Sequence, residues 1–326
     1  MDGWALLIDG GTTHTRFTLV HDGAGVASVS REVGASDAAG ENPSLERAVG
    51  EVISGLETAH GCRIGAAVAS GMITSEAGLR EVPHRKAPAA LDGLAAAAEP
   101  VRLPKVAPHT VFWLVPGVCF PDGAPEERDV LRGEETEIYG ALRPADADKT
   151  LLFAHFGSHC KLIRCRAGRI DRSVTTIGGE LFGAVSRGTI LRESLAGDVS
   201  GGLLPDWVGR GYEAAESLGF SRALFLTRVN RLMGGASARE SFSYLHGVLA
   251  QADCRAFAPL LAEGADELVL YGRDRPAEAY RICLGRFFRG GIPPLRVIPF
   301  EESEQLSVRG LRRICRELPD QPRKIV

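Results

Sequence analysis

The sequence predicts an α/β protein built from two related lobes, and three observations lead to this fold class. A pattern of three strands joined by tight glycine turns occurs near the N-terminus. The same pattern occurs again 146 positions later, and a region that reads as a helix follows each copy. A duplicated unit of this kind is typical of a two-lobed α/β fold. The 326 residues suffice for roughly two domains, each with its own core.

The first copy contains a turn suited to phosphate. An apolar strand at 4–8 leads through Asp9 into Gly10-Gly11-Thr12-Thr13, and a second strand follows at 15–20. Glycines let the backbone approach an anion closely, and the N–H groups of such a turn bind anions. Asp9 can hold Mg²⁺ directly or through water, and Thr12 and Thr13 can donate to phosphate oxygens. The turn closes a hairpin, unlike a Walker-type loop. The alternative interpretation is an ordinary glycine-rich hairpin.

The second copy repeats the turn without the acid. Gly157-Ser158 aligns with Gly11-Thr12, and strands are expected at 150–154, 160–166 and 169–176. Asp9 aligns with His155, so the first copy alone carries the carboxylate. This asymmetry suits one metal-bound nucleotide between two related lobes. Because few residues match, two unrelated hairpins are the alternative.

The composition excludes several other classes. The net charge of −3 leaves no basic footprint for nucleic acid or an anionic membrane. No apolar run is long enough to span a membrane, and Asp2 stands where a signal peptide would carry basic residues. The seven cysteines form no C-x-x-C pair, so neither a disulfide framework nor a zinc site is indicated. We expect a cytoplasmic protein.

The remaining segments complete the two lobes. Residues 80–108, rich in Ala and Pro, are expected to form an excursion or a loop on the substrate side. We expect lobes at 1–145 and 146–326, with the option that the last helix packs back on the first lobe. Strands are expected at 26–33, 64–73, 111–115, 267–271 and 295–298. One helix is expected to begin at Pro43 and another, short one to end at Leu142. Further helices are expected at 179–195, 211–232, 240–257, 276–288 and 302–318.

Six motifs occur in an order that resembles a known family. They are Ile8-Asp9-Gly10-Gly11-Thr12, Ser70-Gly71-Met72, Pro116-Gly117-Val118-Cys119, Arg132-Gly133-Glu134-Glu135-Thr136, Gly157-Ser158-His159-Cys160-Lys161 and Gly179-Glu180-Leu181. Over nearly the whole chain they resemble the 2-dehydro-3-deoxygalactonokinase family, within the sugar kinase, Hsp70 and actin superfamily. The resemblance implies two ribonuclease-H-like lobes with mixed five-stranded sheets around a nucleotide cleft. It also implies ATP-dependent phosphorylation of the 6-hydroxyl of 2-dehydro-3-deoxy-D-galactonate. The implied partner is a small sugar acid, without nucleic acid or membrane, and a homodimer is compatible with it.

The resemblance assigns roles to acids of the first lobe. Phosphoryl transfer needs a metal across the phosphates and a group that accepts the proton of the attacking hydroxyl. Asp9 is expected to position Mg²⁺, and Glu134 to act as the general base. Glu135 competes with Glu134, because adjacent side chains diverge by about 100° on a helix. A plain acidic cluster at a helix N-terminus is the alternative.

Further binding residues follow from the same resemblance. Gly157, Ser158 and His159 form the expected second phosphate turn, and Gly179 is expected to begin the helix beneath the adenosine. Arg16 is the first candidate for the substrate carboxylate, because a guanidinium can grip it with two hydrogen bonds. An ordinary strand arginine is the alternative for Arg16. Ser36, Gly71 and Glu135 are further candidates on the sugar side.

One segment departs from the family pattern. Where the family has Ala-Gly-Thr/Ser-Leu, this chain has Tyr271-Gly272-Arg273-Asp274-Arg275-Pro276. Gly272 still lets the backbone approach a nucleotide, whereas the bulk of Tyr271 and the arginine at 273 put the adenosine contacts in doubt. Arg273 or Arg275 could restore binding by stacking on adenine. Two alternatives stay open: a kinase for another sugar acid or deoxy-ketose, and a catalytically silent binding protein or regulator.

Overall fold

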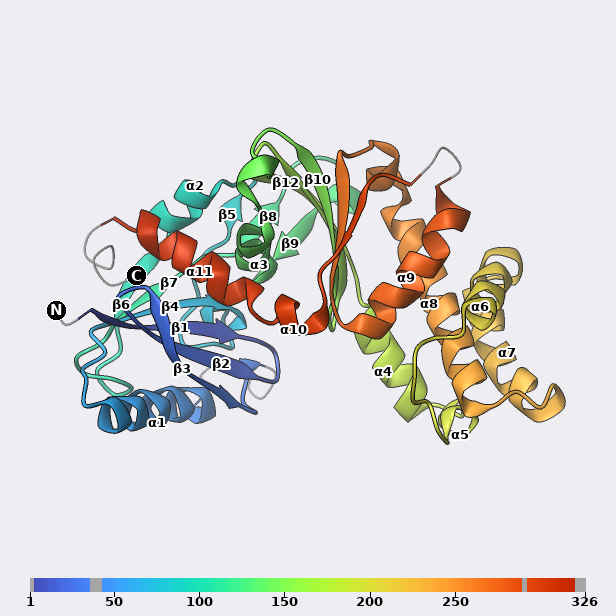
Figure 1. The fold of residues 1–326 in the computed structure, drawn as a ribbon, viewed down its shortest axis with the longest axis horizontal. Coiled ribbons are helices and arrows are strands. Elements are labelled where there is room, and N and C mark those ends of the chain that lie inside the picture. The colour runs from blue at the N-terminus through green and yellow to red at the C-terminus, as the bar shows by residue number, and fades with distance from the viewer. Residues whose placement is uncertain (1–2, 36–42, 289–291, 320–326) are drawn as a thin grey trace. The chain divides into compact units, whose positions relative to one another are not determined.

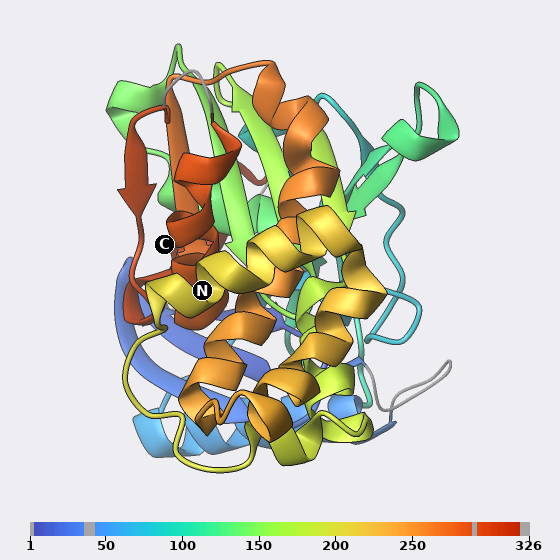
Figure 2. The same cartoon turned by 90° about the vertical axis from the view of Figure 1, so that its right-hand side faces the viewer.

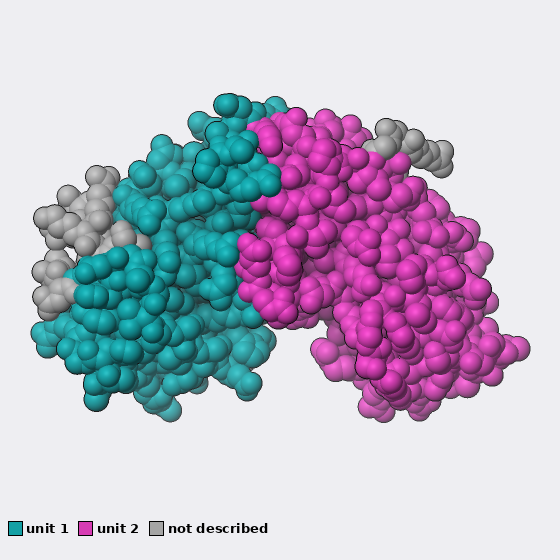
Figure 3. Space-filling view, in the orientation of Figure 1, with its two compact units in different colours: residues 1–148, 166–172, 304–326 teal, residues 149–165, 173–303 magenta. Residues whose placement is uncertain are grey.

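The computed structural model describes residues 3–35, 43–288 and 292–319. These residues form two compact units (Figure 3). Unit 1 comprises residues 1–148, 166–172 and 304–326, and unit 2 comprises residues 149–165 and 173–303. The chain first passes from unit 1 to unit 2 between Asp148 and Lys149, and the helix nearest the C-terminus belongs to unit 1. No helix among the described residues is long and apolar enough to cross a membrane.

Unit 1 contains a six-stranded mixed sheet in the order β3-β2-β1-β4-β7-β6 (Figure 1). The first three strands form an antiparallel meander, β4 and β7 continue it in parallel, and β6 is antiparallel to β7. Their bounds are β1 Trp4–Gly10, β2 Thr15–His21, β3 Ala24–Arg31, β4 Ala66–Gly71, β6 Glu99–Arg102 and β7 Val111–Leu114. The expected five-stranded sheet therefore has a sixth strand, β6, at its edge.

Alternation along β1 divides the core of unit 1 into two layers. Leu6 and Ile8 pack with the apolar stripe of α1 (Pro43–His60), which includes Leu45, Val49, Val52, Ile53 and Leu56. Ala5 and Leu7 belong to a second cluster with Leu311, Ile314 and Cys315 of α11 (Leu306–Glu317). Because successive side chains of a strand point to opposite faces, Asp9 follows Ala5 and Leu7 onto the α11 side.

Two glycines let α11 approach α3 (Glu134–Ala141) closely. A Cβ atom on Gly310 would overlap the carbonyl oxygen of Thr136, and one on Gly140 would overlap that of Leu306. Any larger residue at either position would force the helices apart. The start of α11 at Leu306 therefore lies beside the end of α3 at Gly140, and its second turn at Gly310 lies beside the first turn of α3 at Thr136.

The expected loop at 80–108 is partly ordered. It contains β5 (Arg85–Lys86), α2 (Leu91–Ala96) and β6, and β5 joins β8 (Val118–Phe120) and β9 (Asp129–Leu131) in a small sheet. The loop prediction was wrong because these elements are too short to show a periodic pattern. The burial of Leu94 and Ala95 stabilises α2, although its six residues are too few to show a helical pattern in the sequence.

Unit 2 repeats the strand order of unit 1. Its sheet runs β12-β11-β10-β13-β14, which matches β3-β2-β1-β4-β7, and this confirms the predicted duplication. The strand bounds are β10 Thr150–Phe156, β11 Cys160–Arg166, β12 Arg169–Thr176, β13 Glu267–Gly272 and β14 Leu295–Val297. The helices are α4 Gly178–Gly188, α5 Arg192–Leu195, α6 Pro205–Leu218, α7 Phe220–Met233, α8 Ala238–Ala262, α9 Asp274–Phe287 and α10 Phe300–Ser303. Figure 2 faces α6 and α7, which pack against α8.

Three expected helices are divided in the structure. The helix expected at 179–195 ends at Gly188 and is followed by the separate α5. The one expected at 211–232 is split into α6 and α7 at Gly219, which has a φ of 84°. The one expected at 302–318 is split into α10 and α11. At Gly219 the positive φ is incompatible with a continuous right-handed helix.

Candidate active site

The Gly10-Gly11 hairpin is closed and leaves its hydroxyls accessible. Gly11 N–H donates to the carbonyl oxygen of His14 at 2.8 Å, and Thr13 is exposed at the tip. The backbone at 34–35 lies against the hairpin, since Ala35 N–H donates to the carbonyl oxygen of Gly11 at 3.3 Å. The expected contribution of Ser36 lies outside the described residues. The hairpin therefore presents Thr12 and Thr13 as the predicted phosphate donors.

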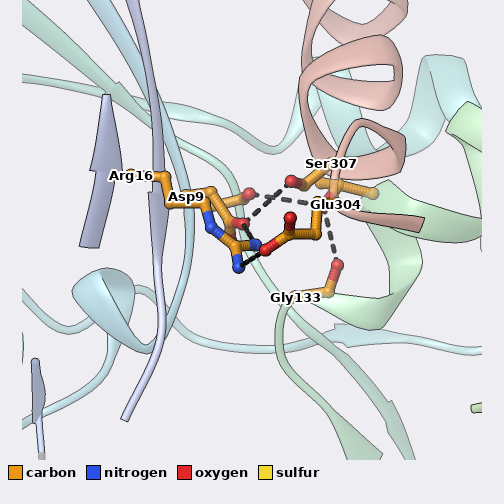
Figure 4. A network of polar contacts seen from close by, with 7 residues as sticks. Asp9, Arg16, Gly133, Glu304 and Ser307 are labelled. Carbon is orange, nitrogen blue, oxygen red and sulfur yellow. Dashed lines mark hydrogen bonds and ion pairs between the residues drawn. The ribbon is translucent and has the colours of Figure 1, made fainter. Parts of the chain in front are cut away.

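Asp9 is fixed at the end of β1 by a serine that the sequence did not indicate. Ser307, in the first turn of α11, donates its hydroxyl to the Asp9 carboxylate at 2.8 Å (Figure 4). The Asp9 side chain remains 21% exposed, and Arg16 Nη1 lies 3.9 Å from it. Burial raises the pKa of Asp9, while Ser307 and Arg16 oppose that rise. Asp9 is thus an oriented carboxylate with an accessible face.

Arg16 is engaged by two acids. Its other terminal nitrogen forms an ion pair with Glu304, which lies two residues before the start of α11 (Figure 4). The Arg16 side chain is 41% exposed. A substrate carboxylate would have to replace Glu304, which presents the same chemical group. The role of Arg16 in substrate binding stays a prediction.

Three glycines stack the expected catalytic turn onto the phosphate hairpin. Gly133 has a φ of 117°, and a Cβ atom there would lie 3.4 Å from the Cα of Gly71. A Cβ atom on Gly71 would overlap the carbonyl oxygen of Gly10. The hydroxyls of Ser70 and Thr136 are 3.3 Å apart, so two motifs separated by more than sixty residues meet here. The close approach requires glycine at 71, the positive φ favours it at 133, and a Cβ atom on Gly10 would overlap the side chain of Ile73.

Glu134 and Glu135 occupy different environments on α3. Glu134 is half-buried, accepts a hydrogen bond from Arg132 N–H at 3.2 Å, and its negative charge contributes to the raised pKa of Asp9. Glu135 is fully buried, and both of its carboxylate oxygens accept from Gly133 N–H at 2.9 and 2.8 Å. Burial first, and the charge of Glu134 second, raise the pKa of Glu135 to about 7. Glu135 thus faces its own turn, whereas Glu134 is electrostatically linked to Asp9.

The raised pKa of Glu135 predicts a pH-dependent stability. The folded pKa of about 7 lies above the unfolded value of 4.5, so protonation favours the folded state. Its contribution is fully present below pH 4.5 and is lost as the pH rises through 7, in total about 3 kcal/mol at about 1.4 kcal/mol per pK unit. We expect Glu135→Gln to remove this loss when urea unfolding is measured at pH 5 and pH 8. An equal pH dependence in the variant and the wild type would contradict the assignment.

The second phosphate turn packs against the beginning of α4. Gly157 N–H donates to the carbonyl oxygen of His159 at 3.2 Å, and Glu180 N–H donates to that of Ser158 at 2.8 Å. A Cβ atom on Gly179 would overlap the carbonyl oxygen of Gly157. His159 Nε2 lies 3.4 Å from a carboxylate oxygen of Glu180. The sequence-predicted residues 157–159 and 179 therefore lie together within unit 2.

The turn after β13 remains open to a ligand. Gly272 has a φ of 100°, and Arg273 N–H donates to the carbonyl oxygen of Phe156 at 2.7 Å. Tyr271 is 1% exposed and packs against Phe153 and His155, so its ring points into the core and the expected obstruction does not arise. Arg275 lies over the ring of Phe242, with its guanidinium carbon 5.1 Å from the ring centroid.

A cavity of about 520 Å³ brings these unit 2 elements together. It is lined by Gly157, Gly179, Phe182, Val199, Phe242, His246, Arg273, Asp274, Arg275, Pro276 and Phe300. Its volume is within the usual range for small-molecule and cofactor sites. The sequence indicated the two turns, but the aromatic residues at 182 and 242 and His246 lie in helices whose pattern resembles that of ordinary core.

Asp9 fits a magnesium site that is completed by a ligand. Among the described residues, no three His, Cys, Asp or Glu side chains form a group that could hold a metal by themselves. Mg²⁺ is usually bound through one or two carboxylates together with substrate phosphates and water. The partly exposed carboxylate of Asp9, beside the Gly10-Gly11 turn, is chemically suited to be the protein part of such a set, and its role as a metal ligand stays a prediction.

Both units repeat one strand order, and a glycine turn follows the first strand of each. Residues 9–314 match the family model of 2-keto-3-deoxy-galactonokinase, and the chain belongs to this family.

Two relatives accompany this match. A crystal structure of a Sinorhizobium meliloti protein described as a 2-dehydro-3-deoxygalactonokinase has a TM-score of 0.75 at 23% identity, covering 96% of this chain and 98% of that one. The Rhizobium meliloti (strain 1021) protein named "Probable 2-dehydro-3-deoxygalactonokinase DgoK1" is 30% identical over 183 residues, which are 55% of this chain. The matched part spans 57% of that curated relative.

Proposed function

We propose that this protein transfers the γ-phosphoryl group of ATP to the 6-hydroxyl of 2-dehydro-3-deoxy-D-galactonate. Membership of the family supports the reaction and the substrate. The observation that carries the chemistry is the stacking of the Gly133-Glu134 turn on the Asp9-Gly10-Gly11 hairpin through Gly71. The negative charge of Glu134 contributes to the raised pKa of Asp9, and this proximity supports the roles that we propose for them as general base and metal ligand.

In this mechanism, Asp9 would hold Mg²⁺ and Glu134 would accept the proton of the 6-hydroxyl. Bound Mg²⁺ supplies positive charge for the β- and γ-phosphates. Ser307 keeps the Asp9 carboxylate oriented through its hydrogen bond. Glu134 removes the proton as the oxygen–phosphorus bond forms, while the bond to the leaving ADP oxygen breaks. Little covalent chemistry is required of the protein beyond this positioning.

We propose the following division of binding residues. Gly11, Thr12 and Thr13 in unit 1 and Gly157, Ser158 and His159 in unit 2 bind phosphate, and Gly179, Gly272 and Arg273 bind the nucleoside. Arg16 binds the carboxylate of the sugar acid by exchanging it for Glu304. Gly71 contributes to the sugar side through its backbone, with Ser36 as a further sequence candidate. Glu135 supports the turn. None of the seven cysteines, all of which lie in the described part of the chain, forms a disulfide, which is compatible with the proposed cytoplasmic location.

The test is an assay of ADP release across a panel of 2-keto-3-deoxy sugar acids with ATP and Mg²⁺. We expect the galacto acid to give the highest kcat/KM and its gluco epimer to give a lower value. The Asp9→Asn variant provides the background rate. ADP release that no sugar acid stimulates, or wild-type protein that binds no nucleotide by calorimetry, would contradict the proposed kinase function. A higher kcat/KM for a different acid would contradict the substrate.

A further inference from the structure

His246 lines the unit 2 cavity and belongs to an aromatic cluster. It is on α8, 5% exposed, and its ring stacks on Phe182 with centroids 4.6 Å apart. It also meets Phe242 edge to face at 4.7 Å. A recess of about 30 Å³ adjoins the main cavity, and both are lined by His246, Phe182, Gly179 and Pro276. The imidazole therefore borders both spaces.

Two polar atoms at this cavity have no hydrogen-bond partner within the described part of the chain. They are Nε2 of His246 and Nη1 of Arg275, and both atoms are buried. The other terminal nitrogen of Arg275 donates to the carbonyl oxygen of Val199 at 2.9 Å. Because a buried polar atom without a hydrogen bond destabilises the fold, unpaired groups beside a cavity indicate a partner from outside the chain.

The imidazole is neutral over the working pH range. Burial first, and the positive charge of Arg275 second, lower the pKa of His246 to about 3. A neutral imidazole can donate or accept a hydrogen bond according to its tautomer, but it does not offer the charge that a carboxylate would need. It suits an uncharged flat ligand that presents polar atoms along its edge.

The cavity combines two kinds of lining. Gly157 and Gly179 of the second phosphate turn line it together with His246, Phe182 and Phe242. A ligand that binds phosphate at the turn would place its other end among the aromatic rings. A nucleotide combines these two chemistries, because its base is flat, apolar on its faces and polar at its edge.

We propose that His246 is a specificity-determining residue that hydrogen-bonds the edge of a purine base through Nε2. The proposal rests on the proposed function, because it assumes that unit 2 binds a purine nucleoside triphosphate. It adds a base-reading role for a side chain outside all six sequence motifs. Phe182 and Phe242 supply the apolar wall against which the base lies.

The central test compares nucleotide binding by the wild type and His246→Phe. Phenylalanine keeps a flat ring in the aromatic cluster but has no nitrogen atom. We expect the Kd for ATP, measured by calorimetry without sugar acid, to rise about tenfold, which is about 1.4 kcal/mol. The KM for the sugar acid should change little. His246→Gln, which retains a hydrogen-bonding group, should recover part of the affinity.

Tyr244→Phe is the matched control. Tyr244 is on the same helix, and its buried hydroxyl also has no hydrogen-bond partner among the described residues, but it does not line the cavity. Removing this hydroxyl should leave the Kd for ATP unchanged. A second readout compares ATP with ITP, which carries a carbonyl in place of the exocyclic amine. The wild type should discriminate between them, and His246→Phe should discriminate less.

The outcomes separate this inference from the function on which it rests. If the wild type binds ATP and a folded His246→Phe variant binds it equally well, His246 is a core residue and the inference is wrong. If the wild type binds no nucleotide, the proposed function itself fails. A Tyr244→Phe variant that weakens ATP binding as much as His246→Phe would also overturn the inference, since the effect would then belong to α8 as a whole.

Discussion

Glu134→Gln is expected to lower kcat by about 10²- to 10⁴-fold, the usual contribution of a general base. Glutamine preserves the shape of the side chain but cannot accept the proton of the attacking hydroxyl. The KM for ATP should change little, because the lost interaction is made in the transition state. Steady-state kinetics at saturating Mg²⁺ would measure both constants. The loss lies at the lower end of this range if the transition state is loose, because little proton transfer is then needed early.

Glu135→Gln is the control, because it changes the adjacent residue of the same turn. The Glu135 carboxylate binds Gly133 N–H, so its replacement should alter stability and the sugar-acid KM more than turnover. The assignment is wrong if Glu135→Gln abolishes turnover and Glu134→Gln does not. If both variants remain fully active, the Gly-Glu-Glu segment has a structural role.

Asp9→Asn is expected to reduce kcat by at least about 10²-fold, the scale of losing a preorganised charge at the reacting phosphoryl group. The substitution is isosteric, and asparagine can still accept the hydrogen bond from Ser307. The fold should therefore persist, which circular dichroism and thermal unfolding would check. The weaker affinity of a neutral amide for Mg²⁺ should also shift the Mg²⁺ dependence to higher concentration.

Ser307→Ala is the matched control for Asp9. It removes the hydrogen bond that orients the carboxylate but keeps the negative charge. A positioning role predicts a smaller loss of kcat than Asp9→Asn gives. Near-normal turnover of Asp9→Asn at saturating Mg²⁺ would remove Asp9 from the mechanism.

Much of the fold could be predicted because its signal is local. The strands at 160–166 and 169–176 coincide with β11 and β12, since glycine turns mark their ends. The division at Gly219 was missed because a single glycine is tolerated within many helical patterns. The edge strand β6 was missed because its four residues are too short to alternate clearly.

The residues of the candidate site also differ in whether the local sequence indicates them. Turns with glycine and hydroxyl residues carry their own chemistry, so Gly11, Gly157 and Gly272 could be singled out in the sequence. Ser307 and His246 act through neighbours far away in the chain. Ser307 belongs to an amphipathic helix, and His246 belongs to a helix that is buried over most of its length. Their meaning depends on tertiary contacts, which a single sequence does not contain.

The order of synthesis bears on how unit 1 is completed. Residues 304–319 leave the ribosome after all of unit 2, yet α11 covers one face of the β1 sheet and supplies Ser307 beside Asp9. Until then, Ala5 and Leu7 lack the part of their apolar cover that α11 provides, and the Asp9 carboxylate lacks its hydroxyl donor. Residues 149–303 have no such dependence for their own sheet. The second unit can therefore mature during translation, whereas the first must wait, uncovered on one side, for a helix made more than 150 residues later.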